Sequence, residues 1–113
     1  MILSTMNDLP GATVEEVLGQ VFGLTVRSRN VGSQLGAGLK SLVGGELRGL
    51  TAALVESRQQ AQQRLVDQAT DLGADAVLAM RFDATEIGGG WQEVCAYGTA
   101  VRLGDGAGIA RGA

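Results

Sequence analysis

The stretch EVCAYGTAVRL, residues 93–103, decides the fold of this chain. Its residues fall into two alternating sets, as in a β-strand, where successive side chains point to opposite faces. One set is Val94, Ala96, Gly98 and Ala100, and the other is Glu93, Cys95, Tyr97, Thr99, Val101 and Leu103. Neither set is clearly polar, so we expect this strand to lie in a sheet that needs a cover on both faces.

A partner strand is predicted immediately upstream, over ADAVLAMRFD at residues 74–83. Strict alternation would place Ala76, Leu78, Met80 and Phe82 on one face and Val77 and Ala79 on the other. The segment EIGGG at 86–90 is typical of a turn. The strand at 74–83 and the returning strand at 91–103 therefore form a predicted hairpin.

Two more strands are predicted near the N-terminus, a short one over 1–5 and a long one over 13–27. Asp8, Pro10 and Gly11 between them indicate a turn. Alternation along the long strand gives two predicted faces, one with Leu18, Phe22, Leu24 and Val26 and the other with Val17, Gly19, Val21 and Gly23.

One long helix is predicted over residues 47–72, with Gly73 as the left-handed residue that ends it. Its apolar stripe is Leu47, Leu50, Leu54, Ala61, Leu65, Ala69 and Leu72, and its wet side is Arg58, Gln59, Gln62, Gln63 and Asp67. A short helix is predicted over 30–45. Its glycines weaken it, each by about 1 kcal/mol relative to alanine.

These elements predict an α+β fold, a two-layer subunit in which an antiparallel sheet packs on one long helix. The domain would span residues 1–104, and residues 105–113, which have no periodicity, would be a disordered tail. One long helix covers only one face of a sheet that is apolar on both. We therefore expect another subunit to supply the second cover.

The composition excludes several classes of function. The net charge of −3 argues against a nucleic-acid partner, which normally requires a basic surface. A single cysteine cannot form an internal disulfide, and no signal peptide or membrane-spanning run is visible. The expectation is a soluble cytoplasmic protein without a membrane partner.

Cys95, the only cysteine of the chain, has three interpretations. It can be a small buried hydrophobic residue of a central strand, as free cysteines commonly are. It can be a metal ligand together with Glu93 and other carboxylates, but with no histidine in the chain the ligands would have to come from several subunits. A catalytic nucleophile is disfavoured, because it normally needs a nearby base. We expect no catalytic residues and no cofactor other than a heavy-metal ion.

Carboxylates flank the predicted hairpin at Asp75, Asp83, Glu86 and Glu93. Glu86 and Glu93 would approach each other across the turn and suit a hard cation or a glycosidase-like pair. The alternative is that all four are solvated charges of turns and edges.

Two other motifs are readily mistaken for ligand sites. The segment GSQLGAGLKS at 32–41 resembles a phosphate loop, but Leu39 separates Gly38 from Lys40, so the glycine that should precede the lysine is missing. A packed helix fits it better. Trp91 follows three glycines and has no basic groove around it, so we expect it to be a contact residue at an interface.

Several segments in order carry a resemblance to a known family: STM, PG, GQVFG, RNVGSQLGAGLKSLVGG, ESRQQAQQRLVDQATDLGADAV and YGTAV. Together they resemble the YbjQ-like family, which carries the label of a heavy-metal-binding domain, over about residues 1–103. The resemblance implies a dodecin-like subunit fold and a homo-oligomeric ring, with five subunits as the implied number. Leu24 stands where an acidic residue is common in the family, which removes a candidate metal ligand.

Three functions are therefore open. The first is a non-enzymatic homo-oligomeric binding or scaffold module, and the second is a metal-binding module that combines Cys95 and carboxylates across subunits. The third is a small-molecule site or an enzyme between subunits. Metal analysis separates the first two, and a ligand found between subunits would favour the third.

Overall fold

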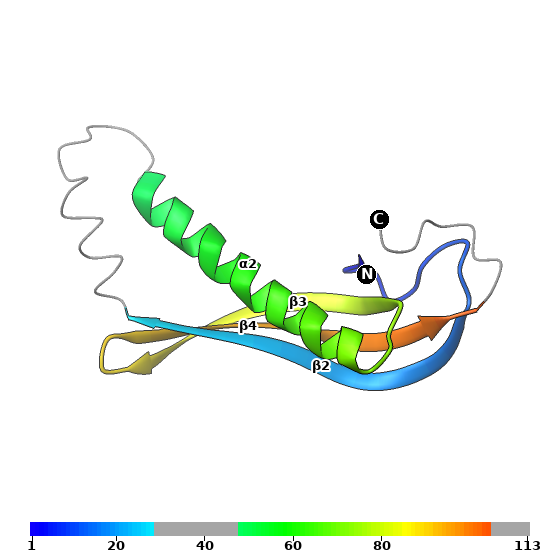
Figure 1. Ribbon diagram of the computed structural model, residues 1–113. Coiled ribbons are helices and arrows are strands. Elements are labelled where there is room, and N and C mark those ends of the chain that lie inside the picture. The colour runs from blue at the N-terminus through cyan, green and yellow to red at the C-terminus, as the bar shows by residue number, and fades with distance from the viewer. Residues whose placement is uncertain (29–47, 105–113) are drawn as a thin grey trace.

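The computed structural model describes residues 1–28 and 48–104 (Figure 1). Its elements are β1 (Ile2–Leu3), β2 (Val14–Ser28), α2 (Arg48–Asp71), β3 (Ala76–Gly88) and β4 (Trp91–Leu103). The helix lies on one face of a four-stranded sheet, which confirms the predicted two-layer α+β fold. The short helix predicted over 30–45, the phosphate-loop-like segment 32–41 and the tail 105–113 lie outside the described residues.

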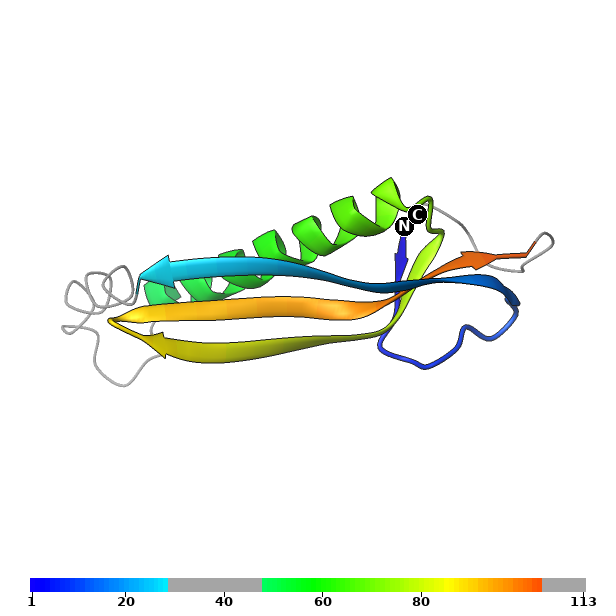
Figure 2. The same cartoon turned by 90° about the horizontal axis from the view of Figure 1, so that it is seen from below.

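The sheet is mixed, not antiparallel throughout as predicted. Its strand order is β1-β3-β4-β2, with β4 in the centre beside β3 and β2, both antiparallel to it. β1 runs parallel to β3, because Ile2 and Leu3 pair with Ala76 and Val77 in the same direction. Residues 4–13 then return the chain to the opposite edge, where β2 begins (Figure 2). The parallel direction of β1 was not predictable, because a strand of two residues is too short to carry a sequence pattern that indicates its partner or its direction.

A bulge in β3 changes which side chains lie under the helix. The register with β4 shifts between Leu78 and Arg81, and Ala79 has a positive φ of 52°. Ala76 and Leu78 therefore lie on the face opposite to α2, whereas Met80 and Phe82 join Val77 on the helix side. The single predicted face of Ala76, Leu78, Met80 and Phe82 is wrong, because an extra residue inverts the alternation that follows it.

The bulge is held by its neighbours. The N–H of Ala79 donates to the Met6 carbonyl at 2.8 Å, and the N–H of Met80 donates to the Ser4 carbonyl at 2.9 Å. Gly98 lies beneath it on β4, where an added Cβ would come within 2.6 Å of Val77 Cγ1. The N-terminal segment and the missing side chain of Gly98 together accommodate the extra residue.

A second irregularity, in β2, has the same effect. The register with β4 shifts between Val17 and Gly19, and Gly19 has a φ of 123°. Leu18 packs against the helix-side core, while Val17 pairs with Val101 of the opposite face. The prediction had placed Leu18 on the face of Phe22 and Val17 on the face of Val21, which is the reverse of the observed arrangement. A lone glycine inside a strand pattern is a known signal for such a bulge.

The helix α2 is present as predicted, but only the middle of its predicted apolar stripe is buried. Ala61, Leu65 and Ala69 are fully buried, whereas Leu54 and Leu72 are 45% and 44% exposed. Figure 1 shows the reason for Leu54: the helix lies against the sheet toward its C-terminal end and diverges from it toward its N-terminal end. Leu72 follows the last residue of the helix, Asp71. The side chains of Leu47 and Leu50 lie outside the described part. The helix-side core is Val21, Ala61, Leu65, Ala69, Val77, Met80, Val94, Ala96 and Ala100.

Gly73 ends the helix as predicted, with a φ of 80°. Its N–H donates to the Thr70 carbonyl at 2.9 Å, and the N–H of Ala74 donates to the Ala69 carbonyl at 3.0 Å. These two bonds are the 5→2 and 6→1 bonds of a Schellman motif. Ala74 packs against the core that contains Ala69, which supplies the hydrophobic contact that accompanies this motif.

We expect Gly73→Val to lower the free energy of unfolding by about 1 kcal/mol or more, because a β-branched residue resists a positive φ. Gly73→Asn should cost less, since asparagine tolerates this conformation. Urea denaturation of the two variants measures the difference. Equal midpoints would contradict a left-handed cap at this position, because an added Cβ meets only Arg102 Nη2, at an ordinary 3.5 Å.

Candidate functional site

The face of the sheet opposite to α2, here called the helix-free face, brings three strands together in regular rows. Phe22, Tyr97 and Arg81 form one row across β2, β4 and β3. The next rows are Leu24, Cys95 and Asp83, and then Val26, Glu93 and Thr85. The β2 column of this face is apolar, and the β3 column is polar and charged.

The apolar column is open to solvent. Phe22, Leu24 and Val26 are 48%, 40% and 50% exposed, and Tyr97 beside them is 36% exposed. Isolated exposed apolar side chains are ordinary, but neighbouring ones on one face mark an interaction surface. This column is the strongest candidate for a functional surface in the described residues.

The other end of the same face is covered by the chain itself. Ala76, Leu78, Val101 and Leu103 form a second buried cluster, and Ile2, Leu9 and Ala12 pack against it. The expectation that another subunit supplies the whole second cover is therefore wrong for this half of the sheet. The N-terminal segment covers it, which the sequence pattern did not reveal.

The outer edge of β2 is closed by side chains from the helix. Gln68 Oε1 accepts the N–H of Phe22 at 2.7 Å, and Arg64 Nη1 donates to the carbonyl of Leu24. These bonds satisfy backbone groups that would otherwise pair with an added strand. Sequence reasoning missed both residues, because polar residues on a helix look like solvated ones. Arg58, predicted on the wet side, likewise stacks over the Phe82 ring at 5.2 Å.

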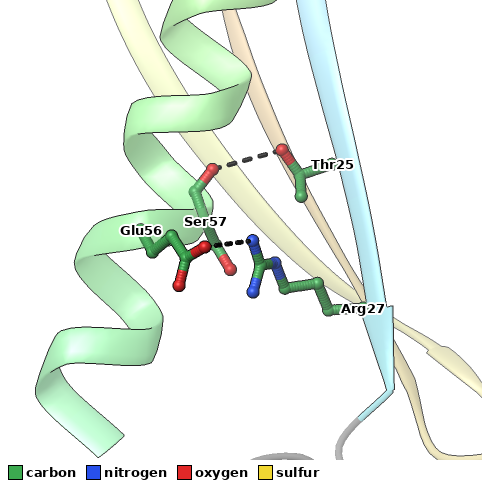
Figure 3. A network of polar contacts seen from close by, with 4 residues as sticks. All are labelled: Thr25, Arg27, Glu56 and Ser57. Carbon is green, nitrogen blue, oxygen red and sulfur yellow. Dashed lines mark hydrogen bonds and ion pairs between the residues drawn. The ribbon is translucent and has the colours of Figure 1, made fainter.

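Two further contacts fix the helix beside the end of β2 (Figure 3). The buried Thr25 hydroxyl donates to the Ser57 carbonyl at 3.2 Å. Arg27 Nη2 lies 3.5 Å from Glu56 Oε1 in a solvent-exposed ion pair. The ion pair is worth at most about 1 kcal/mol, so the buried hydroxyl and the packing of α2 on β2 matter more for the position of the helix.

Cys95 lies on the central strand as predicted, but its side chain is only partly buried, since it belongs to the helix-free face. Its thiol lies 3.7 Å from the Ala96 carbonyl oxygen, to which it donates. Burial raises the pKa of this thiol, and the negative charges of Glu93 and Asp83 raise that pKa further. The group is therefore a neutral thiol at physiological pH.

The predicted metal ligands Cys95 and Glu93 share this face, and Asp83 stands directly beside Cys95 on β3. In residues 1–28 and 48–104, however, no group of three or more cysteine, aspartate or glutamate side chains is arranged to hold a metal ion. Structural zinc usually takes four such ligands. The described residues of one subunit therefore do not fit a metal centre.

The other predicted site residues are separated. Glu86 pairs with Gln92 and Glu93 with Thr85, so the two glutamates point to opposite faces, and the proposed pair across the turn is wrong. Asp75 Oδ2 accepts the N–H of Leu103 at 2.8 Å, which gives it a structural role. Trp91 is 48% exposed, and Gly89 lies next to its ring. An exposed position is consistent with the contact role expected for Trp91.

We expect Cys95 of the folded protein to react with iodoacetamide at neutral pH more slowly than the same cysteine in the denatured chain, because the thiolate is the nucleophile. A raised folded-state pKa also has a consequence for stability. The contribution of the Cys95 thiol to the free energy of unfolding should be the same at pH 7 and at pH 8. It should fall at higher pH, once the thiol of the unfolded chain ionises while that of the folded chain stays neutral. Cys95→Ser lacks this alkaline fall and is the control for both measurements. Equal alkylation rates in the two states would contradict the assignment.

Within the described part of the chain, α2 is not long and apolar enough to cross a bilayer.

Comparisons of the sequence with known proteins identify its family and its relatives. Residues 1–104 match the YbjQ family model, which is described as "Putative heavy-metal-binding". A UPF0145 protein of Streptomyces coelicolor is 69% identical over 101 residues, which are 89% of this chain and 95% of the relative. A UPF0145 protein of Acidothermus cellulolyticus is 63% identical over 103 residues, covering 91% and 95% of the two chains.

A crystal structure of a Pediococcus pentosaceus protein of unknown function, assigned to the DUF74 family, is similar in fold. Its TM-score is 0.56 at 17% sequence identity, over 92% of this chain and 98% of that one. At this identity the likeness concerns the fold alone. From the family match and the close relatives, the chain belongs to the YbjQ-like UPF0145 family, as its sequence motifs indicated.

Proposed function

We propose that this protein is a non-enzymatic homo-oligomeric binding or scaffold module whose helix-free face is a contact between subunits. The observation that carries this proposal is the exposed apolar column of Phe22, Leu24 and Val26 beside Tyr97. An apolar strip on a sheet face is stabilised when another surface removes it from water, by about 25 cal/mol per Å². A second copy of this chain can provide that surface, because it is always present at the same concentration as the subunit that it covers.

A ring requires that two different surfaces of each subunit meet head to tail. The helix layer offers a second apolar surface, because Leu54 and Val55 of α2 are 45% and 47% exposed. Packing of this helix surface on the helix-free face of the next subunit would repeat around an axis and close. The number of about five subunits comes from the family resemblance.

The absence of an enzymatic role is supported by the chemistry of the same face. The thiol of this face, Cys95, has a raised pKa, and the chain has no histidine to act as its base. The neighbouring charges are carboxylates, which favour the neutral thiol over the thiolate.

Native mass spectrometry tests the proposal directly. We expect a multiple of the subunit mass of 11.6 kDa at micromolar concentration, and a mass that corresponds to about five subunits if the ring closes as proposed. The protein should be purified without a tag. A monomer under these conditions would contradict the proposal.

The second candidate function is a metal site shared between subunits, favoured by the position of Cys95, Glu93 and Asp83 on one face. Thermal melts of the parent chain, Cys95→Ser and Cys95→Ala with and without stoichiometric zinc or cadmium separate the two functions. The scaffold proposal predicts no rise in melting temperature in any of the three. A rise in the parent alone would establish soft-metal binding through Cys95.

A further inference from the structure

Trp91, the single tryptophan of the chain, continues the apolar column of the helix-free face to the end of the sheet. The register of β2 with β4 runs without interruption over residues 20–28, so Trp91 points to the same face as Cys95. Its row lies next to that of Val26, and both side chains are half exposed. Figure 2 shows this end of the sheet, where β2 ends beside the hairpin of β3 and β4. The largest side chain of the face therefore stands at the tip of the hairpin.

The turn before Trp91 holds this residue in place. Gly88 pairs with Trp91, so two residues connect β3 to β4, and these residues, Gly89 and Gly90, have positive φ angles of 63° and 82°. Two such residues form a type I′ turn, the tight turn that fits the twist of a hairpin. Gly89 also lies next to the indole, since an added Cβ would be 3.4 Å from Trp91 Cδ1. A side chain held beside a tight turn loses little freedom on binding, which favours a contact through Trp91.

The N-terminal half of α2 offers a surface for such a side chain. Leu54 precedes Ala61 by seven residues and Leu65 by eleven, so it belongs to the side of the helix that is buried farther along. It is nevertheless exposed, because the helix diverges from the sheet there, and Val55 beside it is exposed as well (Figure 1). These two side chains lie on the helix side of the sheet and Trp91 lies on the other side, so they can meet only between two subunits.

We propose that Trp91 is the anchor residue of the contact between subunits, and that its indole packs on Leu54 and Val55 of α2 in the neighbouring subunit. This inference rests on the proposed function, in which the helix-free face meets the helix layer of the next subunit. It names the residue that carries the contact and sets the direction of the contact, with the tip of the hairpin on the N-terminal half of the helix. Tryptophan is among the residue types enriched at interface positions that carry most of the binding energy.

The charges beside these residues favour α2 as the partner over a second helix-free face. Glu93 lies two residues after Trp91 on the same face. Arg58 is exposed and follows Leu54 by one helical turn on the same side of α2. With Trp91 on Leu54, Glu93 therefore approaches an opposite charge of the neighbouring subunit. A second helix-free face placed tip to tip would instead bring Glu93 near its own copy, and the positive charge of Arg81 lies three rows away from Trp91.

Because the chain has one tryptophan, its fluorescence reports on this contact without any substitution. We expect dilution from the assembled to the dissociated protein, followed by sedimentation velocity, to shift the Trp91 emission to longer wavelength and to increase its quenching by acrylamide. The same emission and quenching in both states would overturn the proposal, while the assembly itself would leave the proposed function in place. A monomer at every concentration would contradict the proposed function and this inference together.

Truncation of the indole tests its share of the affinity. Trp91→Ala should weaken self-association about 100-fold, the size of effect found at a hot spot of an interface. Met6→Ala is the matched control, because Met6 is also half exposed but lies in the N-terminal segment, away from the hairpin tip, and is bonded there through its backbone. Sedimentation equilibrium measures the dissociation constants. A Trp91→Ala protein that is folded by circular dichroism and assembles as well as Met6→Ala would overturn the proposal.

A substitution on α2 tests which surface receives the indole while Trp91 stays intact. Leu54→Glu should weaken self-association about 100-fold and shift the Trp91 emission to longer wavelength, because a carboxylate would have to be buried under the ring. Gln63→Glu is the matched control and should change neither quantity, since nine residues are about two and a half helical turns and place Gln63 opposite to Leu54. A Leu54→Glu protein with the parent emission and the parent assembly would overturn the proposal, whereas Leu24→Asp, which charges the helix-free face, tests the proposed function separately.

Discussion

Replacement of Gly23 by alanine is expected to lower the free energy of unfolding by about 3 kcal/mol, the upper end of the usual cost of overpacking. The backbone of α2 crosses β2 at this residue. A Cβ added to Gly23 would overlap the Ala61 carbonyl oxygen and would lie 2.5 Å from the Leu65 nitrogen and 2.9 Å from Arg64 Cβ. Two of these three contacts are backbone atoms, so a side chain cannot swing aside and the helix itself must move.

The cost should come from displacement of the helix from a fully buried core. Leu65 and Ala61 are 0% exposed, and a shift of α2 loosens their contacts with the sheet. Gly104→Ala is the matched control, because its added Cβ would meet neighbours at 3.7 and 3.9 Å, which are ordinary contacts. Urea denaturation measures both variants. A Gly23→Ala midpoint equal to that of Gly104→Ala would show that the helix does not approach β2 so closely.

Replacement of Leu24 by aspartate is expected to weaken self-association about 100-fold, which is the size of effect found at a hot spot of an interface. Leu24 is the middle residue of the apolar column and is 40% exposed in the subunit. A carboxylate there would have to be buried without a partner beside Asp83 and Glu93, which is costly. The subunit itself should remain folded, since Arg64 bonds the Leu24 backbone carbonyl and not its side chain.

Leu72→Asp is the control for this experiment. Leu72 has a similar exposure of 44% but lies at the C-terminal end of the helix layer. Sedimentation velocity at a series of concentrations should show smaller species for Leu24→Asp and the parent species for Leu72→Asp. An unchanged assembly in Leu24→Asp would remove the helix-free face from the contacts between subunits.

The candidate site was only half visible from the sequence. The pattern placed Phe22, Leu24 and Val26 on one face of their strand and Cys95 and Glu93 on one face of another, and the structure agrees; that these two faces form one surface came only from the pairing of β2 with β4. It did not place Arg81 and Asp83 beside them. Those residues reach the helix-free face only because the bulge at Ala79 inverts the alternation of β3. Gly19 gave a signal for the corresponding bulge in β2, but Ala79 is an ordinary residue and gave none.

The sequence by itself determined the elements that depend on neighbours along the chain. The hairpin, the long helix and its end at Gly73 all follow from local periodicity and from the backbone freedom of glycine. The extent of the hairpin does not, because β3 continues to Gly88 through residues that were predicted to form the turn. Only the tertiary structure decided the parallel pairing of β1, the cover over Leu78 and Val101, and the closure of the β2 edge by Gln68 and Arg64. Each of these joins segments far apart in the chain. Their geometry depends on bulges and on the approach of the helix at Gly23, which an alternating pattern of apolar residues does not encode.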